Sequence, residues 1–322
     1  MLDRKQSIGQ TLIKFRTILI LIALAAIFTA LKPIFLHPTN LLNMMKRMSY
    51  VAITAYGMTF IITLSALDIS GGSIAALVGV CLAFLLNKGI ALVIGLPGVI
   101  LLALLLGYIN GFITVKGKIA PFLVTLSTMN IYRGIALTLT AGRTVSIKNQ
   151  GFTDFFGNGS LLGVIPMPLI LMILLFILCW FLYHKTKFGF YCRCIGGNEE
   201  AAKVAGIDVD KIKLMSYTFN GFLACFAGLI LSALMNAGIP DIGSDLSMDA
   251  IAAVVLGGTA IAGGLGTMWG TVGGTFIIAI LNTGLSLLGA QSQVQILVKG
   301  IVIILAVLMD NAFKARTVVV KK

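Results

Sequence analysis

Long apolar runs constrain the fold of this chain more than any other feature. They recur from Ile18 to Leu308, and apolar residues make up 58% of the 322 residues whereas charged residues make up 11%. A helix crosses the bilayer core with about 20 consecutive, mostly apolar residues. The sequence therefore predicts an all-α integral membrane protein in which residues 1–322 form a single transmembrane domain.

The runs predict about ten transmembrane helices. They cover residues 17–36, 49–67, 71–87, 89–115, 119–141, 161–183, 213–236, 248–264, 267–289 and 293–309. The first span follows a basic stretch, as a signal peptide does, but its apolar run continues through Phe35 and is long enough to span the bilayer. We therefore expect it to remain as a membrane anchor. The segments outside the spans leave no room for a soluble catalytic domain.

The distribution of Lys and Arg predicts the orientation of these spans. If the N-terminus is cytoplasmic, the basic residues cluster on the cytoplasmic side, in the tail 1–16, the loop 184–212 and the tail 310–322. The opposite side then carries an acidic loop with Asp241, Asp245 and Asp249. This is the positive-inside pattern, so both termini are expected in the cytoplasm. The basic residues form no clustered face with interleaved aromatic residues, and no nucleic-acid partner is expected.

A short polar helix is predicted within the cytoplasmic loop, over residues 196–206. Asn198 is suited to the N-cap position, and Glu199 and Glu200 follow in the first turn, where the helix dipole favours acidic side chains. Gly206 is suited to end the helix. A helix of about two turns is not stable alone in water. We therefore expect it to pack against other elements and to be offered to a partner protein.

Glycines spaced four residues apart predict close packing of helices. Gly107 and Gly111 form one such pair, and Gly266, Gly270 and Gly274 form a doubled version. In lipid, small residues allow helix backbones to approach closely. We expect these glycines to pack helices within one subunit, and a seam between two copies is the alternative.

Polar residues within or between the spans are the candidates for a solute pathway. Asp68 and Ser70 lie between two apolar runs with no cation beside them in the sequence. They either cap the following helix at the membrane edge or line a cavity where a helix is broken. Asn130 and Arg133 are three residues apart and share one face of the fifth span. Arg133 either lines the pathway or reaches the outer surface, and Asn130 lies deeper.

Four further polar residues interrupt apolar runs and are expected to bond to neighbouring helices. They are Asn110, Asn220, Asn282 and Lys299. In a membrane, side chains of this kind join helices by hydrogen bonds.

Motifs that would indicate an enzyme are missing. The sequence contains no phosphate-binding G-x-x-x-x-G-K-[ST], no H-E-x-x-H and no G-x-S-x-G. Cys192 and Cys194 form a lone C-x-C pair with only His184 nearby, which is too few ligands for a zinc site. We expect no metal, no cofactor and no catalysis in this chain, although a two-carboxylate or Ser–Lys site stays open.

Taken together, these segments resemble the ribose-type sugar permeases of ATP-binding-cassette (ABC) importers, within the branched-chain amino acid/ribose permease family. The predicted helix and the following residues to Lys213 are similar to the coupling segment of those permeases. Three further stretches agree in order and spacing: Leu67–Ser73, Thr125–Gly134 and Asp249–Gly266. The similarity covers nearly the whole chain. Departures from the commoner residues occur at Ala66, Gly71, Leu265 and Thr267, so the resemblance does not identify the sugar.

The resemblance implies a permease that carries a monosaccharide, ribose or another sugar, across the bacterial inner membrane. Two permeases, either two copies or this chain with a sister chain, would form the path within the lipid. A cytoplasmic ABC ATPase would bind ATP and Mg²⁺, and an extracytoplasmic sugar-binding protein would deliver the solute, with the acidic loop facing it. The residues implied to contact the ATPase are Asn198, Glu199, Glu200, Ala201, Ala202, Lys203 and Gly206.

An ion-coupled secondary transporter of a small polar solute is the alternative function. Such a transporter needs a titratable group or an ion site near the middle of the membrane. Asp68 is the only acidic residue in the sequence that suits this role.

Overall fold

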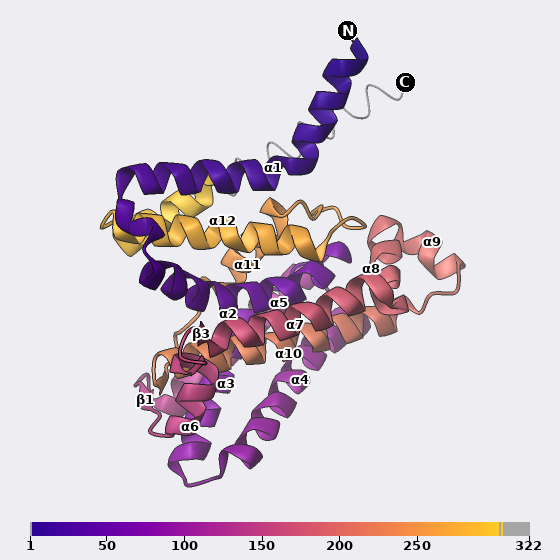
Figure 1. The fold of residues 1–322 in the computed structure, drawn as a ribbon. Helices are drawn as coiled ribbons and strands as arrows, with labels where there is room; N and C mark the ends of the chain where they lie inside the picture. The colour runs from indigo at the N-terminus through magenta and orange to yellow at the C-terminus, as the bar shows by residue number, and fades with distance from the viewer. Residues whose placement is uncertain (1, 303, 305–322) are drawn as a thin grey trace.

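A computed structural model of the protein describes residues 2–302 and 304. The described chain is mostly helical, and its long helices lie alongside one another in a bundle (Figure 1). The helices are α1 (Leu2–Leu31), η1 (Pro33–Leu36), α2 (Pro38–Thr63), α3 (Gly71–Asn87), α4 (Leu92–Lys116), α5 (Pro121–Thr140), α6 (Gln150–Thr153), η2 (Asp154–Asn158), α7 (Met167–Lys185), α8 (Lys187–Gly197), α9 (Glu199–Val204), α10 (Val209–Leu234), α11 (Leu246–Leu256) and α12 (Met268–Leu287). A last helix covers Ser292–Val302.

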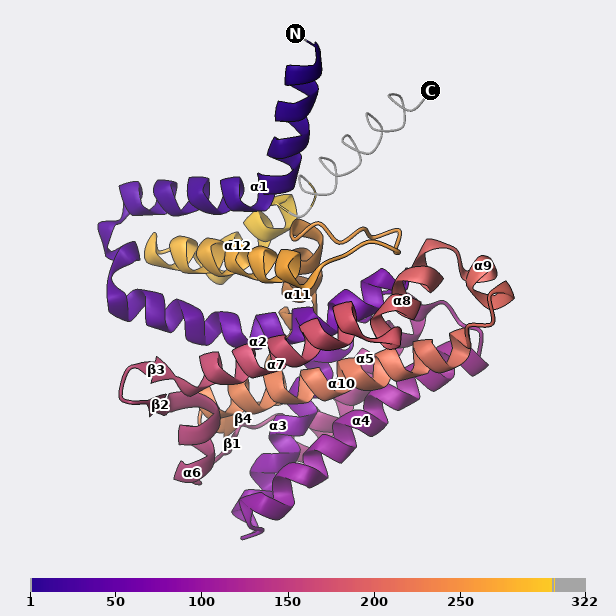
Figure 2. The same ribbon diagram turned by 45° about the vertical axis from the view of Figure 1, so that its right-hand side comes forward.

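Two short antiparallel strand pairs lie at the end of the bundle away from α9 (Figure 2). Strand β1 (Val145–Ser146) pairs with β4 (Ala237–Gly238), and β2 (Ser160–Leu161) pairs with β3 (Ile165–Pro166). The first pair joins the segment after α5 to the segment after α10, so it ties together elements that are far apart in the sequence.

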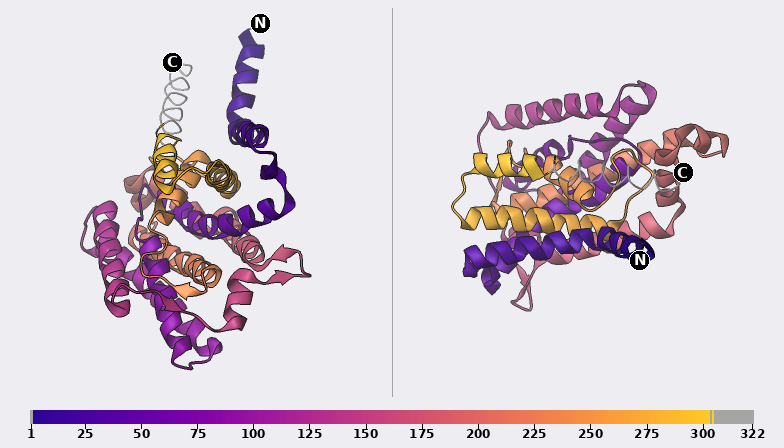
Figure 3. Two further views of the ribbon diagram at one scale, coloured as in Figure 1. Left: turned by 90° about the vertical axis from the view of Figure 1, so that its left-hand side faces the viewer. Right: turned by 90° about the horizontal axis from the view of Figure 1, so that it is seen from above.

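The core of the bundle is built around α2 and α10. Every residue of α2 from Val51 to Thr63 is buried, which is typical of a helix surrounded by others on all sides. Helix α10 packs against α2, α3 and α4. On the other side of α2, helices α1 and α12 lie next to each other, with the last helix beside α12 (Figure 3).

Helices α3 and α11 begin inside the bundle rather than at its ends. The Gly72 N–H donates a hydrogen bond to Ser247 Oγ at 3.1 Å, so the N-terminus of α3 meets the N-terminus of α11. The two helices have 17 and 11 residues, fewer than the roughly 20 needed to span a bilayer. Each follows a long central helix through a return segment, residues 64–70 or 235–245. Discontinuous helices of this kind are a feature of many transporter folds.

The structure confirms a helical protein with long apolar helices but not the count of ten spans. Among the described residues, five helices are long and apolar enough to cross a membrane: α4, α5, α7, α10 and α12. The predicted span 248–264 is wrong, since α11 ends at Leu256 and a glycine-rich turn follows with positive φ at Gly258, Gly263 and Gly264. The predicted span 161–183 starts too early. Residues 160–166 form the β2–β3 hairpin, and helix α7 begins only at Met167. The tail 310–322 lies outside the described residues.

The glycines of α4 lie against the backbone of α10 within the same chain. A Cβ added at Gly107 would lie 3.1 Å from Thr218 Cα and still closer to the Tyr217 carbonyl oxygen. A Cβ at Gly111 would lie 3.1 Å from Leu214 Cα. The two helices therefore approach as closely as small residues permit.

The second set of glycines is divided between a helix and the turn before it. In α12, Gly270 faces the Gly257 carbonyl and Gly274 faces the Ala253 carbonyl, so α12 packs directly on the end of α11. Gly266 precedes α12, and a Cβ there would lie 2.9 Å from the Tyr183 hydroxyl. It therefore takes part in the turn rather than in a helix–helix seam.

We expect Gly107→Ala to lower the thermal stability of the purified protein, because the added methyl group would meet the α10 backbone. Overpacking of this kind typically costs about 1–3 kcal/mol. Gly98→Ala is the matched control, since it lies in the same helix and a Cβ added there would have no other atom within 4 Å. The comparison is made by thermal unfolding in detergent, and equal unfolding temperatures for the two variants would contradict the proposed packing.

Candidate functional site

Helix α9 projects with α8 from the ends of α7 and α10, away from the rest of the bundle (Figures 1 and 2). Its ends confirm the predicted capping. Asn198 Oδ1 accepts a hydrogen bond from the Ala201 N–H at 2.9 Å, and Gly206 adopts a φ of +81° just after the helix. Glu199 and Glu200 lie in the first turn, close to the positive end of the helix dipole.

One face of α9 is exposed and the other is buried. On the exposed face, the Glu200 carboxylate accepts a hydrogen bond from Lys203 Nζ at 3.1 Å. The side chain of Glu200 is 84% exposed, and Val204, four residues later on the same face, is 90% exposed. Ala201 and Lys203 are also exposed, whereas Ala202 is buried against the protein core. Val204 is not among the contact residues predicted from the sequence, although it is the one large apolar residue in this short polar helix. Glu200 and Val204 are therefore the side chains of α9 most accessible to another protein.

Glu199 joins α9 to α10. Its carboxylate accepts a hydrogen bond from Lys213 Nζ at 2.7 Å and lies 3.1 Å from Lys203 Nζ. The hydrogen bond from Lys213 and the contact with Lys203 hold the pKa of the Glu199 carboxyl below its usual value, against the opposing effect of partial burial. The ion pair is therefore formed at neutral pH, and it links the short helix to a central helix of the bundle.

Helix α8 fixes the same segment to three other parts of the chain. Gly196 lies against the Thr63 carbonyl at the end of α2, where a Cβ would have no room. The Gly264 N–H donates to that same carbonyl at 2.9 Å, and Arg193 Nη1 donates to the Tyr183 carbonyl at 2.7 Å. Residues 187–206 therefore contact the ends of α2 and α7 and the turn after α11. A displacement of this segment would act on all of them.

A second polar cluster lies deep in the bundle, around Asp68. The Asp68 side chain accepts hydrogen bonds from the Ser70 N–H at 2.9 Å, from the Ser70 hydroxyl at 2.6 Å and from Asn220 Nδ2 at 2.9 Å. Both Asp68 and Ser70 are fully buried. The carboxyl group therefore lies just before α3 and inside the bundle rather than at the membrane edge. The capping alternative is wrong, because no side-chain hydrogen bond from Asp68 or Ser70 caps α3.

The Asp68 cluster extends to two further helices. Asn110 Nδ2 on α4 donates to the Ser70 hydroxyl at 2.8 Å, and the Tyr132 hydroxyl on α5 donates to Asn110 Oδ1 at 2.9 Å. The chain of hydrogen bonds thus joins the beginning of α3 to α10, α4 and α5. It also confirms that Asn110 and Asn220 bond to neighbouring elements, as expected.

The two candidate residues on α5 have different surroundings. Arg133 Nη1 donates to the carbonyls of Pro240 and Ile242 at 2.8 and 2.9 Å, so it holds the return segment before α11. Asn130 is exposed, and its amide donates only to the Leu126 carbonyl of its own helix at 3.2 Å. The Asn130 side chain is therefore accessible on the surface of α5, whereas the Arg133 guanidinium is engaged by the Pro240 and Ile242 carbonyls.

The acidic loop is shorter than predicted. Asp249 belongs to α11, and its carboxylate lies 2.9 Å from Lys299 Nζ, with both side chains 12% exposed. The prediction that Asp249 lies in an outer loop is wrong, because Lys299 from the last helix compensates it in the interior. Asp241 and Asp245 remain substantially exposed. Asn282 Nδ2 also approaches Asp249, at 3.4 Å, so Asn282 and Lys299 both bond to a neighbouring helix, as expected.

Comparisons with known proteins give the family. Residues 40–307 match the model of the family described as branched-chain amino acid transport system / permease component. The chain is 43% identical to the ribose import permease protein RbsC of Bacillus subtilis, over 90% of each chain. It is 40% identical to RbsC of Haemophilus influenzae, over 94% of this chain and 95% of the relative.

A more distant relative is named after a different sugar. The chain is 32% identical to the xylose transport system permease protein XylH of Haemophilus influenzae, over 94% of this chain and 98% of the relative. No solved structure matches this chain. Because the family model and these relatives cover nearly all of the sequence, the chain belongs to the family of branched-chain amino acid transport system permease components.

Proposed function

We propose that this chain is the permease subunit of an ABC importer and that it carries ribose or a closely related monosaccharide. The observation that carries the proposal is 40–43% identity to ribose import permeases over at least 90% of this chain. The 32% identity to a xylose permease supports the same class of solute. The chain itself is a transport subunit, and ATP with Mg²⁺ would be bound and hydrolysed by a partner ATPase.

We infer that the ATPase docks on α9. The exposed face with Glu200 and Val204 supplies the contact surface, flanked by Ala201 and Lys203. Asn198 and Gly206 hold the helix in shape from its two ends. Ala202 and Glu199 support the helix from within, since one is buried and the other is paired with Lys213.

Movement of the ATPase would reach the membrane helices as rigid-body displacement. The Glu199–Lys213 pair passes it to α10, and the contact of Gly196 with the Thr63 carbonyl passes it to α2. Both central helices lead directly into the return segments before α3 and α11. Helix α9 thus acts on the two central helices from which the broken helices continue, which suits a mechanism of alternating access.

The remaining partners follow from this arrangement. We propose a multi-pass protein of the bacterial inner membrane, a single permease domain whose termini lie in the cytoplasm on the same side as α9. The exposed Asp241 and Asp245 would face a sugar-binding protein on the opposite side. A second permease, identical or a sister chain, would complete the path, and Asn130 on the exposed face of α5 is a candidate for lining it.

The docking surface is tested by replacing its exposed residues. We expect the double variant Glu200→Arg, Val204→Asp to reduce at least tenfold the amount of ABC ATPase recovered with the tagged permease from solubilised membranes. Val164→Asp is the matched control, because Val164 is 65% exposed in the β2–β3 hairpin at the other end of the bundle. Undiminished recovery with the double variant would remove α9 as the docking site.

The transmission step is tested by the Glu199–Lys213 pair. We expect Lys213→Glu to leave ATPase recovery unchanged but to lower ATP-driven sugar uptake several-fold, because like charges would separate α9 from α10. The charge exchange Glu199→Lys, Lys213→Glu restores opposite charges and should recover most of the uptake. If Lys213→Glu transports like the wild type in reconstituted vesicles, the pair has no part in coupling.

The energy source separates an ABC importer from an ion-coupled transporter. We expect sugar uptake into vesicles that contain the permease, its ATPase and its binding protein to require ATP and to persist when ionophores abolish all ion gradients. The three hydrogen bonds that Asp68 accepts support a structural role for it rather than ion coupling. Uptake that follows an ion gradient without ATP would refute the importer.

A further inference from the structure

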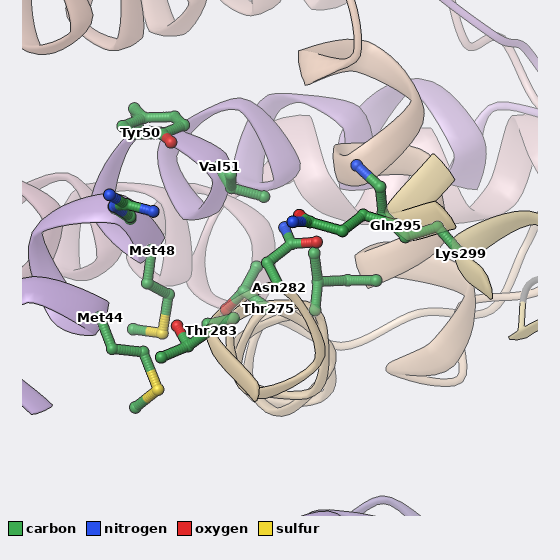
Figure 4. A pocket seen from close by; sticks show the side chains of 12 residues that line it. Met44, Met48, Tyr50, Val51, Thr275, Asn282, Thr283, Gln295 and Lys299 are labelled. Carbon is green, nitrogen blue, oxygen red and sulfur yellow. The ribbon is translucent and has the colours of Figure 1, made fainter. Parts of the chain in front are cut away.

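Two pockets lie along α12 and differ in chemistry. One, between α2, α12 and the last helix, is lined by polar and charged side chains such as Arg47, Asn282 and Lys299 (Figure 4). The other lies nearer the start of α12, between α2, α7 and α12, and has a volume of about 520 Å³. Its surface is almost entirely apolar. This second pocket, the α7–α12 groove, therefore suits a hydrocarbon chain rather than a polar solute.

Both tryptophans of the chain line the α7–α12 groove. Trp180 comes from α7, and Trp269 comes from the first turn of α12, where it packs edge-to-face on Phe176 with 4.7 Å between the ring centres. The Trp269 side chain is 65% exposed. In membrane proteins, tryptophans gather at the level of the lipid headgroups. The tryptophans therefore indicate that one end of the groove lies close to the membrane surface.

Positive charge without an acidic partner lies at the same end. Lys185 Nζ is 5.7 Å from the centre of the Trp180 ring, and both Lys185 and Lys187 are exposed. Neither lysine forms an ion pair with another described residue. The nearby Arg193 guanidinium is directed to the Tyr183 carbonyl. Helices α2, α7, α8 and α12 contain no Asp or Glu, so the elements around the groove supply no anion for these lysines.

We propose that the α7–α12 groove binds one anionic phospholipid, with an acyl chain against its apolar wall and the phosphate paired with Lys185. Lysine side chains extend along apolar surface to place the ammonium group at the headgroup level. Basic sites between membrane helices on the cytoplasmic side bind anionic headgroups. The assignment to the cytoplasmic leaflet rests on the proposed function, whereas the groove and its charge do not. Because α8 begins at Lys187, the headgroup would lie beside the segment 187–206.

Tryptophan fluorescence tests the site, since both indoles of the chain line the groove. The full permease is reconstituted into phosphatidylcholine bilayers in which a fixed fraction of the lipid carries bromine on an acyl chain. Bromine quenches the fluorescence of an indole that it touches. The brominated lipid is either phosphatidylglycerol, which is anionic, or phosphatidylcholine, which has no net charge. At equal mole fraction, we expect brominated phosphatidylglycerol to quench at least twofold more strongly.

The headgroup contact is tested by removing the lysine. With Lys185→Ala, brominated phosphatidylglycerol should quench no more than brominated phosphatidylcholine does. Lys211→Ala is the matched control, because Lys211 is also an exposed lysine but lies in the first turn of α10, beside α4. This control should keep the preference for phosphatidylglycerol. A preference that survives in Lys185→Ala would overturn the proposed contact.

The acyl-chain contact is tested by filling the groove. The double variant Ile173→Phe, Ile177→Phe adds bulk to two lining residues of α7 that are 46% and 55% exposed. The double variant Leu174→Phe, Leu178→Phe makes the same kind of change at positions of α7 outside the lining that are 57% and 39% exposed. We expect the first variant to lose the preference for phosphatidylglycerol and the second to keep it.

The outcomes separate this inference from the proposed function. Equal quenching of the wild type by the two lipids would overturn the lipid site, because it would report only the surrounding bilayer. Quenching by neither lipid would also overturn it, since the groove would then be covered by protein, such as a helix of a second permease. Both results leave ATP-driven sugar uptake untouched. Conversely, a chain that fails to import sugar but prefers phosphatidylglycerol would refute the importer and keep the lipid site.

Discussion

The buried Asp68 carboxyl group is the interaction on which the arrangement of the bundle depends. A carboxyl group with no exposure to water is costly unless its oxygens are hydrogen-bonded, and here three donors meet it. Two of them belong to Ser70, at the start of α3, and the third is Asn220 in the middle of α10. The start of α3 is therefore held at a fixed position along α10. This is why α3 begins inside the bundle instead of at the end of α2.

The second broken helix uses the same principle with a different partner. Near the start of α11, Asp249 is held by Lys299 of the last helix, and both groups are almost buried. A buried ion pair brings little net stability, but loss of either partner would leave an uncompensated charge. The two starting points touch through Gly72 and Ser247. Movement of α10 relative to the last helix would therefore displace the starts of α3 and α11 together, as a transporter that alternates between two states requires.

The sequence predicts those parts of the molecule that depend on local chemistry. Apolar run length identifies the membrane class, and Asn198 and Gly206 identify the ends of α9, because caps act within one turn. Hydropathy cannot distinguish a span from a glycine-rich apolar turn, so the span predicted over residues 248–264 continued wrongly past the end of α11 at Leu256. Contacts between residues that are far apart in the sequence could not be predicted either. Nothing local joins Asp249 to Lys299, and the exposure of Val204 depends on how α8 and α10 hold the short helix.

The two glutamates at the start of α9 show how one helix can be both firmly attached and accessible. Glu199 and Glu200 are adjacent, so their side chains leave the helix about 100° apart, and both carboxylates lie 3.1 Å from Lys203 Nζ. Glu199 is tied to Lys213 on α10, whereas Glu200 faces solvent four residues before Val204 on the same side. If both faced solvent, a partner could move the helix without moving the bundle. In the proposed mechanism, Glu199 attaches α9 to the bundle, while Glu200, which pairs with Lys203 within the same helix, stays exposed to a partner.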